Sequence, residues 1–253
     1  MKKLKFCLLI TVFIFILLVG CSRYPNEVNT PDDVAGKVIG GLEGTPSIRI
    51  ADDLGIARVY FSGADMMIGL RSGEIDCAIM ESTTAAELVS NTSGVRILSE
   101  PILEYELRFA VPMENTGLLK AVNTALEALE RDGILRGLAN KYFSRGSYTY
   151  HSPEDIEYGA GFLTIALPPD SPPFSFKDEE GRFVGMDVDV AIAVSDYLGI
   201  ALRVLEYDVW ELANAVWHGR ADLALGWHPG EGEGIVSTSE PYAKAVHVVI
   251  VRR

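Results

Sequence analysis

Cysteine is scarce in this chain, which has three cysteines in 253 residues. Two of them, Cys7 and Cys21, lie in or directly after an apolar N-terminal run, so only Cys77 lies in the body of the sequence. An intramolecular disulfide is therefore excluded there, and the fold must be stabilised by core packing. The four histidines show no spacing to cysteine or acidic residues that is typical of a metal site. We therefore predict neither a disulfide nor a bound metal.

Basic residues are also few, with 22 lysines and arginines against 35 aspartates and glutamates and a net charge of −13. Such an acidic chain disfavours nucleic acid and anionic lipid as partners, because their phosphates repel it. The same acidity also serves solubility alone. No Gly-x-Ser-x-Gly elbow, P-loop or dinucleotide fingerprint occurs, so we predict no cofactor and no enzyme of those classes.

The chain has one long apolar run, from Phe6 to Gly20, and it follows the basic start MKKLK. A membrane-spanning helix needs about 20 apolar residues, so this run is short for one. A basic start, a short apolar run and small residues before a cut site are typical of a secretory signal. We predict a signal over residues 1–20 and place the rest of the chain outside the cytoplasm.

The apolar run ends in Leu18-Val19-Gly20-Cys21, which resembles the lipobox of bacterial lipoproteins. The resemblance implies cleavage before Cys21 and lipidation of that cysteine, which would anchor the protein to a membrane if two or more acyl chains are attached. Residues 21–33 hold turn formers and two prolines without an apolar period, so we predict a tether. The alternative is an uncleaved anchor helix with an incidental cysteine.

A repeat divides the remaining chain into two similar units. Leu54-Gly55-Ile56-Ala57 leads to Gly73-Glu74-Ile75-Asp76, and Leu198-Gly199-Ile200-Ala201 leads to Gly219-Arg220-Ala221-Asp222. Continuous apolar strands alternating with helices indicate parallel sheets covered on both faces. In order along the chain, each unit is predicted to contain a strand (58–61; 202–207), a helix (65–71; 210–217) and a second strand after the aspartate (77–80; 223–225).

Between and after these units the apolar pattern predicts further elements. We expect a strand over 107–111 and a helical stretch over 117–142 that is broken at Asp132-Gly133. Residues 144–161 lack a sustained period and are predicted to be a connector. A strand over 162–167 then opens the second half, and a strand over 246–251 ends the chain. The predicted fold class is therefore α/β.

Four motifs follow one another in the second half: Pro172-Pro173-Phe174, Gly185-Met186-Asp187-Val188-Asp189, Gly219-x-x-Asp222 and Ser239-Glu240-Pro241-Tyr242. This series resembles the opening lobe of bacterial extracellular solute-binding proteins of family 3. Residues 34–104, with Gly44-Thr45 and Glu81, resemble the second lobe of that family, and residues 105–143 resemble its closing segment. The resemblance implies a two-lobed type II periplasmic-binding-protein fold, in which each lobe is a mainly parallel sheet with flanking helices.

The order of the lobes is swapped relative to that family. The opening lobe comes last here, so we expect a circularly permuted fold with lobe two over 34–104 and lobe one over 105–253, including the connector 144–161. One crossing near residues 103–106 should remain covalent. The other should become the two chain ends, which would place the lipid tether at the hinge. A rival interpretation is a fragment of a tandem protein, and the signal at residue 1 counts against it.

The resemblance also implies a ligand cleft between the lobes. Glu81, at the end of a strand, falls where the family's ammonium-binding carboxylate lies, and strand ends of this kind face the crevice of α/β sheets. Thr45 as N-cap, Pro46 and Ser47 form a predicted helix start that can receive an anion, although Pro46 lacks an N–H group. The alternatives are a solvent-exposed strand end for Glu81 and simple helix capping for Thr45.

The stretch from Gly226 to Gly234 departs from the family. It contains no arginine where relatives carry the one that grips the ligand's carboxylate, and it offers Glu231 and Glu233 instead. Aromatic faces and acids together suit a cation. The residues predicted to line this altered cleft are Gly226, Trp227, His228, Trp210 and Ser171, the last of which replaces an aromatic of the relatives. Alternatively Trp210 is core and the glutamates lie in a solvated loop.

These features predict a monomeric, lipid-anchored solute-binding protein that captures a small amino-acid-like or amine ligand between two lobes and delivers it to an ABC-type importer. Lobe closure around a ligand is the motion expected of this fold. The missing arginine fits two other functions as well. One is a sensor module that passes a conformational change to a membrane partner, and the other is a dehydratase-like enzyme in which His228 and Glu81 act as acid and base.

Overall fold

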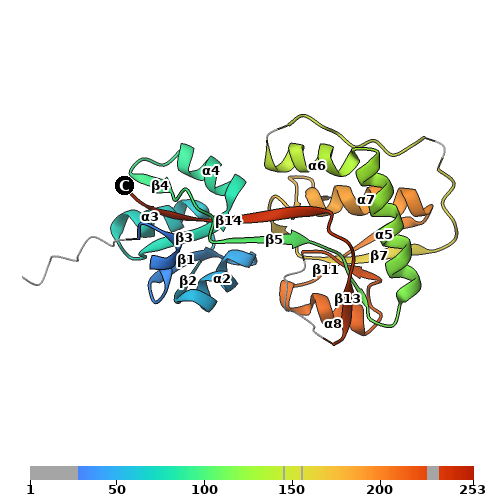
Figure 1. The fold of residues 1–253 in the computed structure, drawn as a ribbon, viewed down its shortest axis with the longest axis horizontal. Coiled ribbons are helices and arrows are strands. Elements are labelled where there is room, and N and C mark those ends of the chain that lie inside the picture. Colours follow the sequence, from blue (N-terminus) through green and yellow to red (C-terminus); the bar gives the residue numbers. More distant parts are fainter. Residues whose placement is uncertain (1–27, 145, 155, 227–233) are drawn as a thin grey trace, which may run out of the picture.

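The computed structural model describes residues 28–144, 146–154, 156–226 and 234–253, and these fold into two lobes joined by two long strands (Figure 1). The predicted signal, the lipidation at Cys21 and most of the tether lie outside the described residues. Trp227, His228, Glu231 and Glu233 lie outside them as well. Within the described part of the chain, no helix is both long and apolar enough to cross a membrane.

The smaller lobe is built on a sheet with strand order β2-β1-β3-β14-β4. The first three strands are parallel, as the repeat predicts, and β14 runs antiparallel to β3. Apolar side chains of β3 are buried on both faces, because helices cover the sheet. Its elements are η1 (Pro31–Val34), β1 (Val38–Leu42), α2 (Pro46–Leu54), β2 (Ile56–Tyr60), α3 (Gly63–Ser72), β3 (Cys77–Glu81), α4 (Ser82–Ser90), β4 (Val95–Ile97) and the C-terminal part of β14 (Ala243–Arg252).

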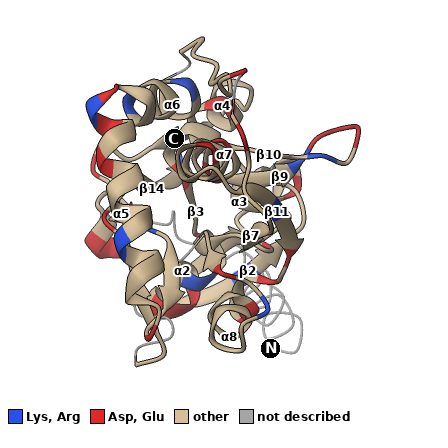
Figure 2. Cartoon of the chain, turned by 90° about the vertical axis from the view of Figure 1, so that its right-hand side faces the viewer, with Lys and Arg blue, Asp and Glu red and all other residues tan. Residues whose placement is uncertain are grey.

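The larger lobe repeats this design on a second sheet with strand order β11-β7-β12-β6-β13, in which the first three strands are parallel. Viewed from the side of this lobe, α5 and α6 lie on one flank and α8 lies at the opposite end, and α5 carries charges of both signs (Figure 2). The elements are β6 (Ala110–Pro112), α5 (Thr116–Arg131), α6 (Ile134–Phe143), β7 (Phe162–Leu167), α7 (Met186–Leu198), β11 (Ala201–Glu206), η2 (Val209–Glu211), α8 (Leu212–Trp217), β12 (Leu223–Ala224) and β13 (Val236–Thr238). A small antiparallel sheet of β8 (Asp170–Ser171), β9 (Ser175–Lys177) and β10 (Phe183–Val184) lies beside it.

Both predicted strand-helix-strand units are confirmed. In each unit the glycine of Gly-x-x-Asp follows a helix and adopts a left-handed conformation, with φ of 79° at Gly73 and 65° at Gly219. Glycine tolerates this conformation because it has no Cβ, and it lets the chain turn sharply into the next strand. One boundary was wrong: Trp210 lies in the 3-10 turn before α8, which begins at Leu212.

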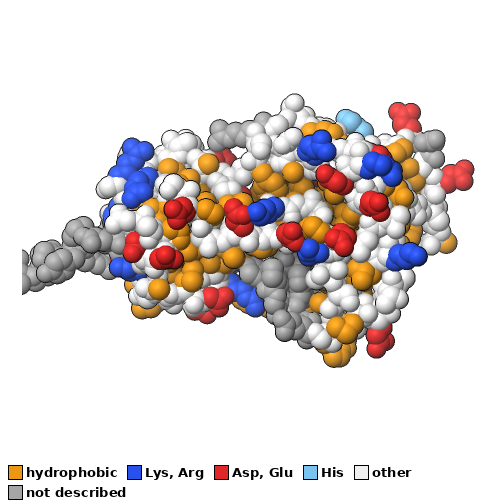
Figure 3. All heavy atoms as spheres, in the orientation of Figure 1, with side chains coloured by type: hydrophobic (Ala, Val, Ile, Leu, Met, Phe, Trp, Pro, Cys, Tyr) orange, Lys and Arg blue, Asp and Glu red, His pale blue; other side chains and the backbone are white. Residues whose placement is uncertain are grey.

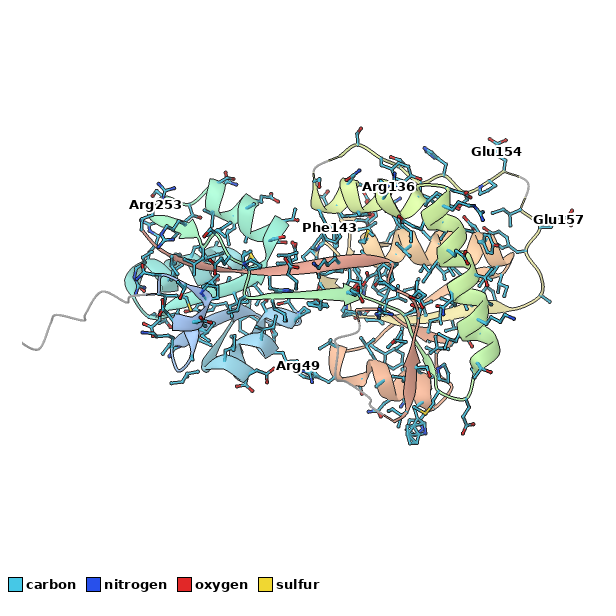
Figure 4. All side chains as sticks on the ribbon, viewed as in Figure 1. Arg49, Arg136, Phe143, Glu154, Glu157 and Arg253 are labelled. Carbon is cyan, nitrogen blue, oxygen red and sulfur yellow. The ribbon has the colours of Figure 1, made fainter. Side chains whose placement is uncertain are left out.

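The two lobes are joined by β5 (Leu103–Leu107) and β14, which pair antiparallel from His247 opposite Leu103 to Ala243 opposite Leu107. The expected covalent crossing near residues 103–106 is therefore present. The expectation that the second crossing becomes the chain ends was wrong, because β14 is continuous. It runs from the larger lobe into the smaller sheet, and Arg253 lies at the end of the smaller lobe remote from the hinge (Figures 1 and 4).

The position of β14 also corrects the expected lobe boundary, since the end of the segment 105–253 belongs to the smaller lobe. Residues 246–251 are apolar apart from His247, and most are buried. This part of β14 lies between β3 and β4 in the sheet, and its backbone N–H and C=O groups pair with both strands. Buried backbone groups need such hydrogen-bond partners. The predicted strand 107–111 is likewise divided, because the chain turns at Arg108 and Phe109 between β5 and β6.

The connector 144–161 contains no helix or strand among its described residues. Tyrosines attach it to the larger lobe. The hydroxyl groups of Tyr150 and Tyr158 donate to the carboxylate of Asp196 on α7, at 3.1 and 2.6 Å. The ring of Tyr148 lies directly against Gly137 of α6, where a Cβ atom would meet ring atoms at 2.6 Å. The connector thus follows the surface of one lobe.

Candidate ligand-binding cleft

Four of the predicted site residues meet where the two lobes face each other. Thr45, Ser47 and Glu81 come from the smaller lobe and Ser171 comes from the larger lobe. They line a pocket with room for about one water molecule, with a volume of about 20 Å³. The other lining residues are Leu42, Pro46, Met80, Thr84, Pro172, Phe174 and His247. The lobes therefore lie close together around a small polar site.

Glu81 is the last residue of β3 and the N-cap of α4, and its side chain is buried. One carboxylate oxygen accepts hydrogen bonds from the N–H groups of Thr83 and Thr84 at 2.8 and 3.1 Å, and the other accepts from the Ser82 hydroxyl at 2.8 Å. The positive end of the helix dipole favours a negative charge here. The Thr84 hydroxyl also lies 3.4 Å from the first of these oxygens, so three donors face that oxygen. A carboxylate oxygen accepts about two hydrogen bonds, so the other oxygen, which accepts from Ser82, retains capacity for a ligand's N–H group.

Thr45 and Ser47 form the start of α2 as predicted, with Thr45 as N-cap and Pro46 in the first turn. The Thr45 side chain does not cap the helix, however. Its hydroxyl donates to the Leu42 carbonyl at 2.8 Å and lies against the Ser47 hydroxyl. Both hydroxyl groups therefore lie at the lobe interface, and the simple capping alternative is wrong for the Thr45 side chain.

A larger cavity of about 710 Å³ opens beside the small pocket. Its lining is acidic and aromatic, with Glu43, Asp170 and Asp208 beside Trp210 and Phe61. Trp210 is 58% exposed, so the interpretation of this residue as core was wrong. The remaining lining residues are Leu42, Gly44, Thr45, Ser62, Gly63, Pro168, Pro169, Pro172 and Val209, so no lysine or arginine contributes to the lining among the residues that the structure describes.

Arg49 of α2 reaches across the cleft, and Figure 4 shows its side chain directed towards the larger lobe. Its guanidinium carbon lies 4.7 Å from the centre of the Trp210 ring. This cation-π contact joins one residue from each lobe. No motif in the sequence distinguishes Arg49, and the available signal was its place in the first turns of a helix that begins in the predicted cleft.

Two aromatic side chains of the crossing strands lie behind Glu81. His247 of β14 is paired in register with Glu81 and is buried. Its ring stacks on that of Tyr105 from β5 with centroids 5.7 Å apart. Burial is the main cause that raises the pKa of Tyr105. Neither residue was predicted, because only the tertiary pairing of β14 with β3 brings them to the cleft.

Gly226 lies where the chain leaves β12, and its φ of 73° favours glycine. A Cβ atom there would meet Pro168 at 3.1 Å, and Pro168 lines the larger cavity. Gly226 itself is not among the residues that line the two pockets, so its place in the cleft stays a prediction. Over the described residues, no three histidine, cysteine or acidic side chains are grouped as a metal site. On the face drawn in Figure 3, acidic and basic side chains are interspersed, so no single-sign patch dominates that face.

Two lobes, two crossing strands and a polar pocket between them define a two-lobed binding protein. Residues 163–253 match the family of bacterial extracellular solute-binding proteins, family 3. Through this C-terminal part the chain is similar to that family, whose members are extracellular proteins that bind solutes. The predicted family resemblance and the α/β fold class are therefore confirmed.

Individual relatives match different lengths of the chain. The L-cystine-binding protein TcyJ of Escherichia coli is 30% identical over 126 residues, which cover 47% of this chain and 46% of that protein. The virulence sensor protein BvgS of Bordetella bronchiseptica is 24% identical over 258 residues, which cover 95% of this chain and 20% of the sensor. The substrate-binding protein of an amino acid ABC transporter is 31% identical over 29% of this chain and 34% of its own, with a TM-score of 0.28. The chain spans about half the length of the cystine-binding relative.

Proposed function

We propose that this chain is a lipid-anchored, extracytoplasmic receptor that binds a small amino-acid-like or amine ligand between its two lobes. The observation that carries the proposal is the buried carboxylate of Glu81 in the pocket between the lobes. A buried carboxylate at the junction of the lobes is costly unless it is paired, and its hydrogen bonds here leave acceptor capacity directed at the pocket. A ligand ammonium group satisfies that capacity.

The surroundings of the pocket support a positively charged group on the ligand. The adjoining cavity is lined by three acids and two exposed aromatic side chains. Carboxylates attract a cation directly, and the face of an indole ring attracts it through the ring quadrupole. Trp210 already holds one cation, the Arg49 guanidinium, which is the type of contact that a ligand cation would make.

The partner that we propose is an ABC-type importer, and the attachment is a lipid on Cys21. The similarity of 47% of the chain to an L-cystine-binding protein supports such a partner. The swapped order of the lobes is part of the same proposal. Residues 34–104 and the end of β14 form one lobe. The connector 144–161 joins the two segments that would be the chain ends in the usual order of the family. Described residues start at Val28 within the smaller lobe, so a lipid on Cys21 would tether that lobe rather than the hinge.

Calorimetry and thermal shift with L-cystine, L-arginine, L-glutamine and a diamine test the proposal. We expect at least one amine-bearing compound to stabilise the protein by about 2.7 kcal/mol at 100 times its dissociation constant. Glu81→Gln should weaken that binding at least tenfold. Glu87→Gln, on the exposed side of α4, is the matched control and should bind like the natural chain. Tighter binding of acidic compounds, or equal binding by Glu81→Gln, would disprove an ammonium site at Glu81.

A sensor function is the second candidate, and one comparison favours it. The match to the virulence sensor protein covers 95% of this chain and 20% of that protein, which supports a module of this kind within a sensor. The two functions differ in the partner. Crosslinking of the lipidated protein in its native membrane separates them, because a transporter permease supports uptake and a signalling protein supports sensing.

A further inference from the structure

The two pockets between the lobes are continuous, because Leu42, Thr45 and Pro172 line both of them. The small pocket, at about 20 Å³, contains the buried carboxylate of Glu81 and has room for a single head group such as an ammonium. The larger cavity, at about 710 Å³, has room for the rest of a ligand. A head group bound at Glu81 therefore lies at one end of a site whose main volume lies beyond it.

Three carboxylates line the larger cavity but not the small pocket, and we call them the distal acids: Glu43 after β1, Asp170 in β8 and Asp208 before η2. Glu43 belongs to the smaller lobe and the other two belong to the larger lobe, so they approach one cavity from both lobes. None of them forms an ion pair with a lysine or arginine among the described residues. Like charges around one cavity repel each other, and a cation between them offsets that repulsion.

Trp210 shows where a cation fits in this cavity. Its side chain is 58% exposed and lines the cavity together with the distal acids. The guanidinium carbon of Arg49, which comes from the other lobe, lies 4.7 Å from the centre of the ring, within the range of a cation-π contact. A cation of the chain itself thus lies on this ring, and a cationic group of a ligand can take the same place.

A carboxylate on the ligand has no cationic partner in these two pockets. Neither of them is lined by a lysine or arginine among the residues that the structure describes, and the guanidinium of Arg49 lies on Trp210. The stretch 227–233, which follows Gly226, contains neither residue type in its sequence. A ligand carboxylate in the larger cavity would instead meet the distal acids, and an anion without a cationic partner is costly to remove from water. The cleft therefore favours a ligand without a carboxylate.

We propose that the ligand is a linear dication without a carboxylate, such as an α,ω-diamine. One ammonium group binds Glu81 in the small pocket. The other lies on the face of Trp210 among the distal acids, where it replaces the guanidinium of Arg49. The inference rests on the proposed function and narrows it, because it excludes amino acids and retains amines that carry a second positive charge.

Calorimetry with three five-carbon compounds tests this ligand class. 1,5-Diaminopentane carries two ammonium groups, 1-aminopentane lacks one of them, and L-lysine differs from the diamine only by an added carboxylate. We expect the diamine to bind about tenfold tighter than either of the others, because it alone satisfies both ends of the site. Diamines with three to eight carbons locate the best length, and each is compared with the monoamine of the same length.

The ratio of diamine affinity to monoamine affinity isolates the second charge, because an effect on lobe closure acts on both ligands. Asp208→Asn should lower this ratio about threefold, since it removes one of the distal acids. Arg49→Ala should raise the ratio about threefold, since the guanidinium no longer competes for Trp210. Asp53→Asn is the matched control: it removes an exposed acid near the end of α2 that lines neither pocket, and it should leave the ratio unchanged.

Failure of this inference is distinguishable from failure of the proposed function. If diamines and monoamines bind equally at every length while Glu81→Gln weakens both, the amine site at Glu81 stands and the second cation site is wrong. Tighter binding of L-lysine than of 1,5-diaminopentane would also overturn the inference, and so would a lower ratio in Arg49→Ala, because Arg49 would then assist the ligand. If no amine binds, both proposals are wrong.

Discussion

Asp222 and Thr164 exchange two hydrogen bonds: the Asp222 N–H donates to the Thr164 carbonyl at 2.7 Å, and the Thr164 N–H donates to Asp222 Oδ2 at 2.8 Å. Asp76 and Val38 do the same in the other lobe, at 2.7 and 3.0 Å. In both lobes the aspartate of Gly-x-x-Asp therefore fixes the start of the first strand. The two halves of the chain therefore share this pair of hydrogen bonds as well as a pattern of elements.

This relationship predicts that either aspartate is a stability residue. Asp222→Ala leaves the Thr164 N–H without its acceptor, and we expect a loss of about 1–3 kcal/mol in the free energy of unfolding. Asp76→Ala should cost a similar amount through Val38. Urea titration monitored by circular dichroism gives both values. Asp53→Ala, an exposed aspartate of α2, is the control, and a loss of the same size there would contradict the assignment.

The contact between Arg49 and Trp210 predicts an effect on lobe closure. Arg49→Ala removes a cation-π interaction worth about 0.5–2 kcal/mol, which favours the form in which the lobes are together. We expect a larger radius of gyration by small-angle X-ray scattering without ligand. Arg58→Ala, which breaks an exposed ion pair with Glu74 within one lobe, should leave the scattering unchanged. Identical curves for both variants would show that Arg49 does not hold the lobes.

Burial raises the pKa of Asp187 to about 6, and this shift predicts how stability depends on pH. The folded chain retains a proton up to a pH of about 6, whereas the unfolded carboxyl group releases it near 3.8. This contribution is fully present below pH 3.8 and is lost as the pH rises through 6, in total about 3 kcal/mol. The free energy of unfolding of Asp187→Asn, relative to the natural chain, should therefore improve by about that amount from pH 3.5 to pH 7. A difference that is constant with pH in urea titrations would contradict the shift.

Attachment of the connector predicts its resistance to proteolysis. Asp196→Ala removes the acceptor of both Tyr150 and Tyr158, so we expect faster cleavage within residues 144–161 and a loss of about 1–3 kcal/mol in stability. Mass spectrometry of limited digests locates the cuts. Tyr197→Phe is a neighbouring control, since Tyr197 is half exposed like Tyr158. Equal cleavage rates in the two variants would show that these hydrogen bonds do not hold the connector.

Local patterns were sufficient for most elements of the fold. The repeat, the break at Asp132-Gly133 and the strand 162–167 depend on residue periodicity, left-handed glycines and helix propensity, which act between near neighbours. The position of β14 could not be derived in this way. Its apolar sequence fits the centre of either sheet, and the choice depends on pairing with β3 and β4, which lie about 150 residues earlier in the chain.

The candidate site, like the fold, could be predicted from the sequence only in part. Motif positions identified Thr45, Ser47, Glu81 and Ser171, and the fold brings these four together in one pocket. The sequence by itself thus determined two repeated α/β units and the polar residues at their strand ends and helix starts, because these follow from local chemistry. Only the tertiary structure decided that both crossings are continuous, that Arg49 meets Trp210, and that the Tyr242 hydroxyl donates to the buried Asp187. Those contacts arise between segments distant in sequence, and packing between the segments selects them.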